Sequence, residues 1–367
     1  MKIMFVIPRM NSGGAERVVA NLSNYLCKNN DVRIVPIVSN ESFYELDKRV
    51  KLCGQPLSIN RKNIFTTLSC YVKYFMGAKK HIKKNLEEFK PDCVISFLVE
   101  ADYLTYSVIK RKKNIVKVFS ERNDPTRRSL AKRLILKRVY KTADLFVCQS
   151  KKVYDYYSYI QKEKKIVIPN PLDEKALPKP ILNEQNHDIV SIGRLCRQKN
   201  YEMLVKSFIS ISDKLPSDSH LIIYGDGPMR GTIQQLIDEN GMSNKIKLAG
   251  RKKQVLDAVK DCALFVLSSD YEGFPNVLLE AMAMGLPVIS TDFYTGTAAE
   301  LVKRKNGMLV PVGDEKKLAD AMLVLMSDEK RRREMRKANI SVRDEYNIEK
   351  INGLWMKAIM KGFSDGK

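Results

Sequence analysis

Short hydrophobic runs alternate along the chain with longer segments in which hydrophobic residues recur at helical spacing. This alternation is typical of βαβ units, whose strands form a parallel sheet. In the first half it predicts strands at Ile3–Ile7, Val32–Val38, Cys93–Ser96, Val116–Ser120, Leu145–Cys148 and Ile166–Ile168. In the second half it predicts strands at Ile189–Ile192, Leu221–Tyr224, Ile246–Leu248, Leu264–Leu267 and Val288–Ser290. The pattern therefore predicts an α/β protein with two Rossmann-like, doubly wound parallel sheets.

A segment rich in proline separates the two halves. It begins at Ile168-Pro169-Asn170-Pro171 and continues through Pro178, Pro180 and the polar stretch 183–187, a composition that interrupts helices and strands. A chain of 367 residues has room for two domains with separate cores. We expect domains over residues 1–175 and 185–345, facing each other across a cleft. A last helix is expected over residues 346–363 and carries the only tryptophan, Trp355. It either caps the second domain or crosses back to the first, and the second arrangement is the more common one in two-domain proteins of this pattern.

The most specific motif is a pair of carboxylates eight positions apart, in the segment Glu272-Gly273-Phe274-Pro275-Asn276-Val277-Leu278-Leu279-Glu280. Asn276 is expected to begin a helix, whose first-turn amides have no partners within the helix. Glu272 would then lie on the loop and Glu280 about one turn inside the helix. A sugar nucleotide matches this pattern, because it has hydroxyl groups at both ends and phosphates between them. The alternatives are that Glu280 only forms an ion pair, or that the two acids are a hydrolytic acid/base pair.

Further glycine turns follow predicted strands and precede helices. The early turn at Asn11–Arg17 contains Gly13 and Gly14, and such a turn offers free amides to an anion or is simply tight. The turn at Gly193–Asn200 carries Arg194 and Lys199 at the carboxyl edge of a sheet, where open α/β sheets bind ligands. These two cations suit a diphosphate, or are solvated loop charges. The turns at Gly225–Pro228 and Thr295–Glu300 are weaker signals of the same kind.

Composition excludes several classes of protein. Hydrophobic residues make up 44% and charged residues 29%, which is ordinary for a folded globular chain. There is no run of about 18 apolar residues, and the apolar start of the chain is expected to be a buried strand, not a signal peptide. Seven cysteines without a Cys-x-x-Cys motif indicate buried thiols in a reducing cytoplasm. Three histidines lack metal-ligand spacing, so we expect no metal and no cofactor.

The net charge of +22 is unevenly distributed. Residues 1–180 hold 36 Lys and Arg against 17 Asp and Glu, a net charge of +19, which leaves +3 for the rest of the chain. Much of the excess lies in 64–89, with Lys79, Lys80, Lys83 and Lys84, and in 127–141, with seven basic residues and no acid. Each segment is either a core-packed helix with a solvated face or a face that binds anionic lipid headgroups. The asymmetry of the whole chain favours a membrane surface.

Taken together, these motifs resemble the GT-B-fold, retaining glycosyltransferases of family 4. The resemblance covers nearly the whole chain and rests on the order and spacing of Gly13-Gly14-Ala15-Glu16, Ile168-Pro169-Asn170-Pro171, Gly193-Arg194-Leu195 with Lys199, Gly225-Asp226-Gly227, and Glu272 through Glu280. It implies transfer of a sugar from a nucleotide diphosphate, usually UDP, with retention at the anomeric carbon and no required metal. The chain also contains no Asp-x-Asp motif.

The resemblance also implies roles for individual residues. Arg194 and Lys199 would hold the diphosphate, Glu272 would contact the donor sugar, Glu280 the ribose, and the amide of Gly14 the diphosphate on domain closure. The nucleotide-sugar site is expected to include Gly193, Gly225, Gly227, Arg251, Gly273, Phe274, Pro275, Asn276 and Val277. Many family members place a histidine at the end of a first-domain strand, whereas this chain reads Phe119-Ser120-Glu121-Arg122-Asn123 there. We assign Glu121 and Arg122 to the site in its place.

The resulting hypothesis is a metal-independent bacterial hexosyltransferase. It would move a hexose or N-acetylhexosamine from a UDP-sugar to a lipid-linked saccharide in cell-surface polysaccharide biosynthesis, as a cytoplasmic protein peripheral to the inner face of the membrane. A second hypothesis keeps the chemistry but has a soluble or protein acceptor. A third is a nucleic-acid-binding protein, which the sequence pI of about 9.6 suggests but no aromatic-basic module supports. We expect no nucleic-acid partner.

Overall fold

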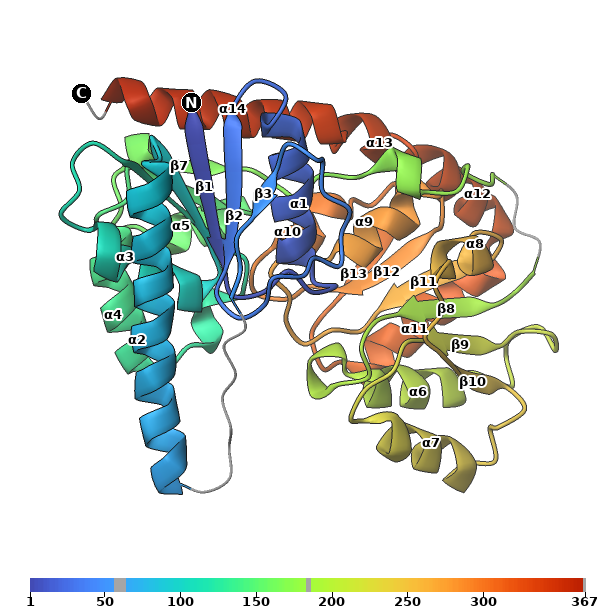
Figure 1. Cartoon of the computed structure of the whole chain (residues 1–367). Coiled ribbons are helices and arrows are strands. Elements are labelled where there is room, and N and C mark those ends of the chain that lie inside the picture. The colour runs from blue at the N-terminus through green and yellow to red at the C-terminus, as the bar shows by residue number, and fades with distance from the viewer. Residues whose placement is uncertain (56–63, 183–185, 366–367) are drawn as a thin grey trace. The chain divides into compact units, whose positions relative to one another are not determined.

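The computed structural model describes the chain except for residues 56–63, 183–185 and 366–367. It divides into two compact units (Figure 1). Unit 1 comprises Met1–Pro171 together with Ile348–Lys367, and unit 2 comprises Leu172–Asn347. The division falls at Pro171, near the start of the segment that we expected to be a linker. Leu172 already belongs to unit 2, where its N–H donates to the carbonyl of Tyr346 at 2.8 Å.

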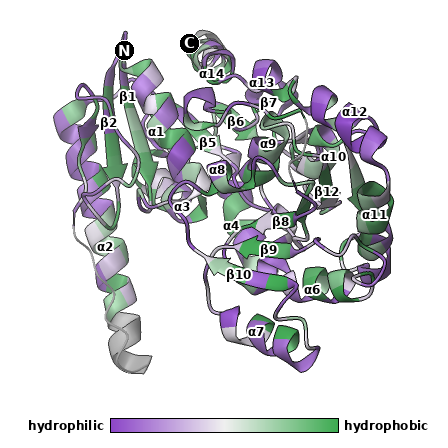
Figure 2. Ribbon diagram, turned by 90° about the vertical axis from the view of Figure 1, so that its right-hand side faces the viewer, coloured by the Kyte–Doolittle hydropathy of each residue, from purple (hydrophilic) through white to green (hydrophobic). Residues whose placement is uncertain are grey.

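Within the described residues, unit 1 contains a seven-stranded parallel sheet of order β3-β2-β1-β4-β5-β6-β7. Its strands are β1 (Lys2–Ile7), β2 (Asp31–Pro36), β3 (Lys51–Leu52), β4 (Cys93–Phe97), β5 (Val116–Ser120), β6 (Leu145–Cys148) and β7 (Lys165–Val167). Its helices are α1 (Gly14–Leu26), α2 (Ile64–Phe89), α3 (Val99–Ile109), α4 (Leu130–Tyr140), α5 (Lys151–Tyr156) and α14 (Ile348–Asp365). Helices cover both faces of this sheet, and its central strands β1 and β4 are nearly continuous hydrophobic runs, as Figure 2 shows for β1.

The last helix, α14, packs against α1, β5 and β6 of unit 1. Its Trp355 is fully buried and stacks on Phe97, with ring centroids 5.8 Å apart. Gly362 lies close to Val116 and Leu145, where a Cβ would meet the Val116 side chain at 3.2 Å. The C-terminal segment therefore completes the core of the first unit.

Within the described residues, unit 2 contains a six-stranded parallel sheet of order β10-β9-β8-β11-β12-β13. Its strands are β8 (Ile189–Ile192), β9 (Leu221–Tyr224), β10 (Ile246–Gly250), β11 (Leu264–Leu267), β12 (Val288–Thr291) and β13 (Gly307–Val310). Its helices are α6 (Tyr201–Ile209), α7 (Arg230–Glu239), α8 (Val255–Val259), α9 (Asn276–Ala283), α10 (Thr297–Leu301), α11 (Glu315–Ser327), α12 (Glu329–Asn339) and α13 (Val342–Glu345). Two hydrophobic clusters, one on each face of the sheet, form its core.

Each sheet has a position at which the order of its strands reverses. In unit 1 the chain goes from β1 outward to β2 and β3, then returns to place β4 on the other side of β1. In unit 2 the same reversal separates β8 from β11. Loops at the carboxyl ends of the two strands diverge at such a position and leave a crevice, which is where open α/β sheets bind ligands. The strand order therefore predicts one such crevice in each unit, at the carboxyl edge of its sheet.

Candidate active site

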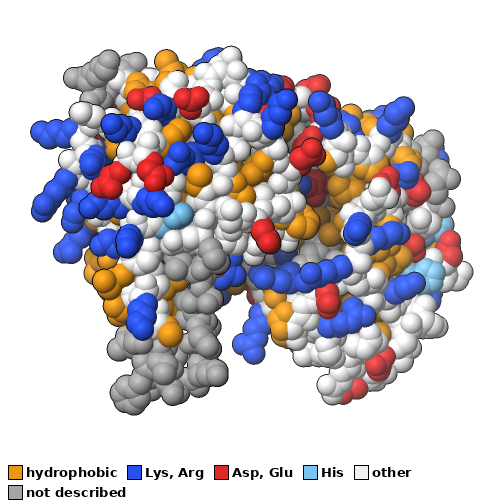
Figure 3. Space-filling model, in the orientation of Figure 1, with side chains coloured by type: hydrophobic (Ala, Val, Ile, Leu, Met, Phe, Trp, Pro, Cys, Tyr) orange, Lys and Arg blue, Asp and Glu red, His pale blue; other side chains and the backbone are white. Residues whose placement is uncertain are grey.

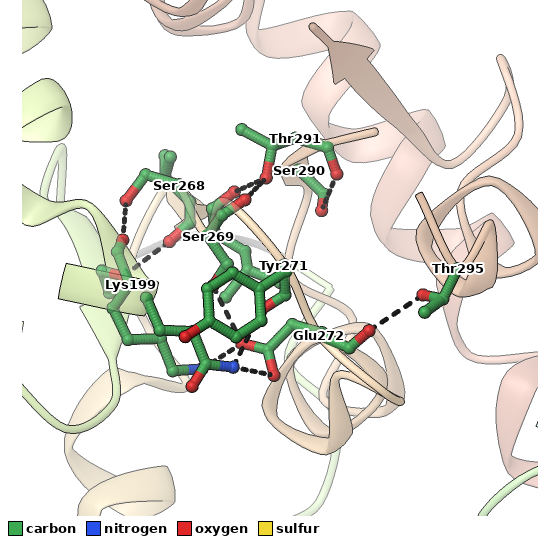
Figure 4. A network of polar contacts seen from close by, with 12 residues as sticks. Lys199, Ser268, Ser269, Tyr271, Glu272, Ser290, Thr291 and Thr295 are labelled. Carbon is green, nitrogen blue, oxygen red and sulfur yellow. Dashed lines mark hydrogen bonds and ion pairs between the residues drawn. The ribbon is translucent and has the colours of Figure 1, made fainter. Parts of the chain in front are cut away.

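The crevice of unit 2 contains an ion pair between two residues that are 73 positions apart (Figure 4). Lys199 lies on the loop after β8, and Glu272 lies on the loop after β11. Lys199 Nζ is 2.6 Å from Glu272 Oε1, and the two side chains are only 15% and 12% exposed. A charge-assisted contact of this length in a largely desolvated place is stronger than a surface ion pair. The pair therefore fixes the positions of two candidate residues that the sequence analysis singled out.

Neighbouring polar groups hold the Glu272 carboxylate in one orientation. Ser269 Oγ donates to Oε1 at 2.9 Å, and Gln198 Nε2 donates to Oε2 at 3.2 Å. Thr295 Oγ1 donates to the backbone carbonyl of Glu272 at 3.0 Å, from the opposite side (Figure 4). The carboxylate is thus anchored by a cation, a hydroxyl and an amide before any ligand arrives.

The two loops are also joined through their backbones. The Asp270 N–H donates to the carbonyl of Gln198 at 2.8 Å, and Ser268 Oγ donates to the carbonyl of Lys199 at 2.8 Å. Asn200 is in the left-handed region, with φ of 45°, and caps α6. Its Nδ2 donates to Asp270 Oδ1 at 2.7 Å. These contacts make the loops after β8 and β11 one rigid wall of the crevice.

Glycines bring three backbone segments together beside this wall. A Cβ on Gly225 would lie 1.9 Å from the carbonyl oxygen of Gly193, and Gly225 has a φ of 140° that other residues rarely adopt. A Cβ on Gly227 would lie 2.4 Å from the carbonyl oxygen of Leu195. Glycine at these positions permits the close approach of the loops after β8 and β9, where the sequence analysis expected nucleotide-binding backbone.

Two cations near this edge have no partner among the described residues. Arg194, on the loop after β8, is exposed, and its side chain forms no hydrogen bond or ion pair with any residue that the structure describes. Arg251 follows Gly250 at the end of β10 and is also exposed, again without a contact to the described residues. Gly225 N donates to the carbonyl of Gly250 at 2.8 Å, which brings the end of β10 to the same edge. The unpaired guanidinium groups leave this edge electropositive.

The segment 272–280 has the conformation that its sequence predicts. Pro275 is the N-cap of α9, Asn276 is its first residue, and no side chain caps the first turn. The Thr297 hydroxyl donates to the carbonyl of Gly273 at 3.2 Å, and Phe274 lies against Tyr346, with ring centroids 6.3 Å apart. Val277 and Glu280 are half-buried within the helix. The first-turn amides of α9 therefore follow directly on the loop that holds Glu272.

The sequence of each unit matches a family model. Residues 12–176 match Glycosyltransferase Family 4, and residues 173–342 match Glycosyl transferases group 1. An uncharacterised glycosyltransferase of Methanocaldococcus jannaschii is 30% identical, over 77% of this chain and 82% of its own length. The chain is a family 4-like glycosyltransferase.

Two further comparisons extend this result over the whole length. An α-1,4-N-acetyl-D-galactosaminyltransferase of Campylobacter jejuni, named for its acceptor GalNAc-α-(1→4)-GalNAc-α-(1→3)-diNAcBac-PP-undecaprenol, is 28% identical over 98% of each chain. The solved structure of sucrose-phosphate synthase from Thermosynechococcus elongatus has a TM-score of 0.83 and covers 100% of both chains at 17% identity. The glycosyltransferase therefore has the GT-B fold, as its sequence predicts.

Three candidate residues of this glycosyltransferase belong to unit 1. Gly14 is the first residue of α1, and Gly13 is its N-cap, so the predicted strand–turn–helix is present. Glu121, by contrast, is 3% exposed and has four donors within unit 1. The N–H groups of Arg122 and Asn123 donate to Oε1 at 3.0 Å, Arg128 Nη2 donates to Oε1 at 2.5 Å, and the Tyr157 hydroxyl donates to Oε2.

Arg122 is also buried, at 6% exposure. Its guanidinium lies over Phe97 at 4.8 Å and over Trp355 at 5.4 Å from the ring centroids, and its Nη1 donates to Asn170 Oδ1 at 2.7 Å. Burial lowers the pKa of Arg122 to about 9. Glu121 and Arg122 are thus enclosed by protein groups, and their contacts connect the loop after β5 to the middle of α14.

Sequence reasoning did not identify the groups that orient Glu272. Gln198, Ser269 and Thr295 are ordinary polar residues, and only their place at strand ends beside the candidate motifs indicates a role. Among the described residues, no group of three or more His, Cys, Asp and Glu side chains is placed to hold a metal ion. No helix in that part of the chain is both long and apolar enough to span a membrane.

Proposed function

We propose that this glycosyltransferase transfers a hexose or N-acetylhexosamine from a UDP-sugar, with retention, to a lipid-linked saccharide in cell-surface polysaccharide biosynthesis. The observation that carries the proposal is the Lys199–Glu272 pair in the crevice of unit 2, with the unpaired Arg194 on the same loop as Lys199. A diphosphate needs cations, and the hydroxyl groups of a donor sugar need an oriented group that accepts their hydrogen bonds. The loops after β8 and β11 supply both.

The proposed roles follow from the position of each side chain and, for Arg194 and Lys199, from the N–H groups that the described residues leave unused. Arg194 can offer its whole fork of N–H donors to the diphosphate, since none of the described residues forms a hydrogen bond or ion pair with it. Lys199 donates one of its three N–H groups to Glu272, and the other two can donate to a phosphate oxygen. Glu272, held from three sides, accepts from donor-sugar hydroxyls, and Glu280 in α9 accepts from the ribose. The close contact of Gly193 and Gly225 brings the backbones of the loops after β8 and β9 together, where the nucleotide would lie against them.

The reaction that suits this wall is a same-face displacement. The acceptor hydroxyl oxygen bonds to the anomeric carbon as the bond from that carbon to the diphosphate oxygen breaks. The hydroxyl proton passes to the departing diphosphate, so no enzymic base is required. The barrier is then lowered chiefly by cations that stabilise the negative charge that develops on the leaving group. We therefore expect transfer to continue in EDTA, and a strict requirement for Mn²⁺ would contradict this mechanism.

The proposed roles of Glu121 and Arg122 are positional. Within unit 1 the Glu121 carboxylate accepts from Arg128 and Tyr157, and Arg122 Nη1 donates to Asn170. Arg122 Nε and Nη2 are buried without a hydrogen-bond partner among the described residues. Glu121 and Arg122 would hold the loop after β5 at the carboxyl edge of the sheet and would not contact substrate. Substitution of either should therefore reduce stability together with activity.

The membrane-surface acceptor is supported by the surface of unit 1. On α4 the apolar side chains of Leu130, Leu134 and Ile135 are 72%, 59% and 47% exposed. The same helix carries four basic residues and no acid. Figure 3 shows Lys and Arg side chains gathered on the side of unit 1 where α2 and α3 lie, with hydrophobic side chains beside them. Exposed apolar groups with basic neighbours are typical of a surface that binds an anionic bilayer. The proposed location is accordingly the inner face of the cell membrane.

The experiment combines donor screening with acceptor extraction. UDP-Gal, UDP-GalNAc, UDP-Glc and UDP-GlcNAc, each labelled in the sugar, are incubated with the protein and with membranes of the cells that encode it. We expect one donor to label the fraction that organic solvent extracts, with an α-linked product. Label only in the aqueous or protein fraction would favour the soluble or protein acceptor, and no transfer from any donor would overturn the proposal.

A sedimentation test addresses the membrane surface separately. The protein should sediment with vesicles that contain anionic phospholipid and should be released by high salt. Joint substitution of Leu130→Ser and Leu134→Ser should reduce sedimentation. Val324→Ser removes an apolar side chain of unit 2 that is 42% exposed and is the control. Equal sedimentation of all three proteins would contradict the role of α4.

A further inference from the structure

The wall of the unit 2 crevice contains a buried polar group that the proposed mechanism does not use. Tyr201 is the first residue of α6 and is 2% exposed, and its ring belongs to the hydrophobic cluster on one face of the sheet. Its hydroxyl is buried and has no hydrogen-bond partner among the described residues. A buried hydroxyl without a partner destabilises the folded state, because water hydrogen-bonds to it in the unfolded chain. A phenylalanine would fill the same space without this loss.

The Tyr201 hydroxyl lies close to the loop that carries Arg194 and Lys199. A Cβ on Gly193 would be 2.8 Å from this hydroxyl and 3.0 Å from Cε of Lys199. The hydroxyl and the lysine stem are therefore neighbours, and both use the space that the missing side chain of Gly193 leaves open. Glycine at this position thus makes room for a hydroxyl beside the lysine that we assign to the diphosphate.

The surroundings of this hydroxyl keep its proton in place. Burial raises the pKa of Tyr201, and the negative charge of Glu272 raises it further. Ser191 on β8 is also near, but its hydroxyl donates to the carbonyl of Val266 at 2.6 Å. The two hydroxyl groups form no hydrogen bond of normal geometry with each other. Tyr201 therefore has an O–H donor that none of the described residues accepts.

The stem of Lys199 can turn while its backbone stays in place. The carbonyl of Lys199 accepts from Ser268 Oγ at 2.8 Å, and its N–H donates to the carbonyl of Cys196 at 3.0 Å. Its ammonium group, by contrast, has one partner among the described residues, the carboxylate of Glu272. A diphosphate carries more negative charge than a single carboxylate and attracts the ammonium group more strongly. Rotation of the flexible four-carbon stem would then move Cε away from the Tyr201 hydroxyl.

We propose that Tyr201 belongs to the donor site and that its hydroxyl donates to a diphosphate oxygen once the stem of Lys199 has turned aside. The inference rests on the proposed binding of a nucleotide diphosphate in this crevice, and it adds a residue that lies outside the sequence motifs. An anionic oxygen is a strong acceptor for such a hydroxyl. The hydroxyl that has no partner within the described chain would gain one from the ligand.

Tyr201→Phe removes the hydroxyl and keeps the ring, so it tests this contact directly. Without ligand, the variant should unfold at a Tm equal to or above that of the unsubstituted protein, because no hydrogen bond of the fold is lost. In a calorimetric titration, its affinity for UDP should be weaker by about tenfold or more, as expected for the loss of a hydrogen bond to a charged group. A hydroxyl that only supports the fold would instead lower the Tm.

Ser219→Ala is the matched control. The Ser219 hydroxyl is also buried without a partner among the described residues, but it lies just before β9, at the amino edge of the same sheet. Its removal should likewise leave the Tm equal or higher, and it should leave the affinity for UDP unchanged.

The outcomes separate this inference from the proposed function. Equal affinity for UDP in Tyr201→Phe and in the unsubstituted protein would overturn the inference, and so would a lower Tm of Tyr201→Phe without ligand. An equal loss of affinity in Ser219→Ala would also overturn it, because the effect would then not depend on the crevice. If the unsubstituted protein does not bind UDP, the proposed donor site itself is wrong.

Discussion

Replacement of Lys199 by methionine should destabilise unit 2 and abolish transfer. The substitution keeps a long, unbranched side chain but leaves Glu272 without its cation in a place where the carboxylate is only 12% exposed. Breaking a buried ion pair costs about 3–5 kcal/mol, but here Ser269 and Gln198 still donate to the carboxylate. We therefore expect a loss of about 2–3 kcal/mol, close to the value of a hydrogen bond between charged groups.

For a unit of this size, 1 kcal/mol corresponds to about 2–4 °C in Tm, so Lys199→Met should lower the Tm by about 4–12 °C. The isosteric change Glu272→Gln leaves the lysine unpaired and should also destabilise. The double variant removes both charges. Its loss of unfolding free energy should be smaller, by at least about 1 kcal/mol, than the sum of the losses in the two single variants.

Thermal and urea unfolding of the four proteins complete this double-mutant cycle. All three variants should lack transfer activity, including the double variant in which stability partly returns. If Lys199→Met unfolds within about 0.5 kcal/mol of the unsubstituted protein, or if the cycle shows no coupling, the ion pair does not organise the crevice.

Three further outcomes are expected. Arg194→Ala should leave the Tm unchanged and abolish the stabilisation by UDP, because this side chain has no partner in the described protein; a lowered Tm would contradict that role. Gly225→Ala should cost at least about 2 kcal/mol, measured by urea unfolding, since φ is 140° and the new Cβ meets the Gly193 carbonyl; wild-type stability would refute it. Burial raises the pKa of Asp102 well above its usual range, so its contribution to stability is complete at low pH and is lost as pH rises through that raised value. Asp102→Asn should remove this pH-dependent loss of stability. Identical profiles of stability against pH for the two proteins would contradict the role of Asp102.

The strands could be predicted because parallel strands covered on both faces must be continuous hydrophobic runs. The prediction omitted β3 and β13, the edge strands at one end of each sheet. Strand β3 has only two residues, Lys51 and Leu52, and β13 begins at Gly307 with just three apolar residues after it. Edge strands of this length carry too little hydrophobic pattern to stand out from a loop.

Lys199 and Glu272 could be singled out as candidates because glycine and charge coincide at the strand ends on which they lie, and the structure places the two side chains in contact. The groups that orient Glu272 could not be predicted, because Gln198 and Ser269 have no unusual spacing and meet only through the order of β8 and β11 in the sheet. The position of the Tyr201 hydroxyl could not be predicted either, because only the folded chain brings it beside the loop after β8.

Thermal unfolding of the whole chain with and without UDP tests the central claim most directly. If the crevice of unit 2 binds the nucleotide diphosphate, UDP at 100 times its Kd should add about 2.7 kcal/mol to the stability of that unit. The added stability should be lost in Arg194→Ala and kept in Lys137→Ala, which removes a cation on α4 of unit 1. An unchanged unfolding curve at millimolar UDP, or an equal shift in Arg194→Ala, would contradict the account.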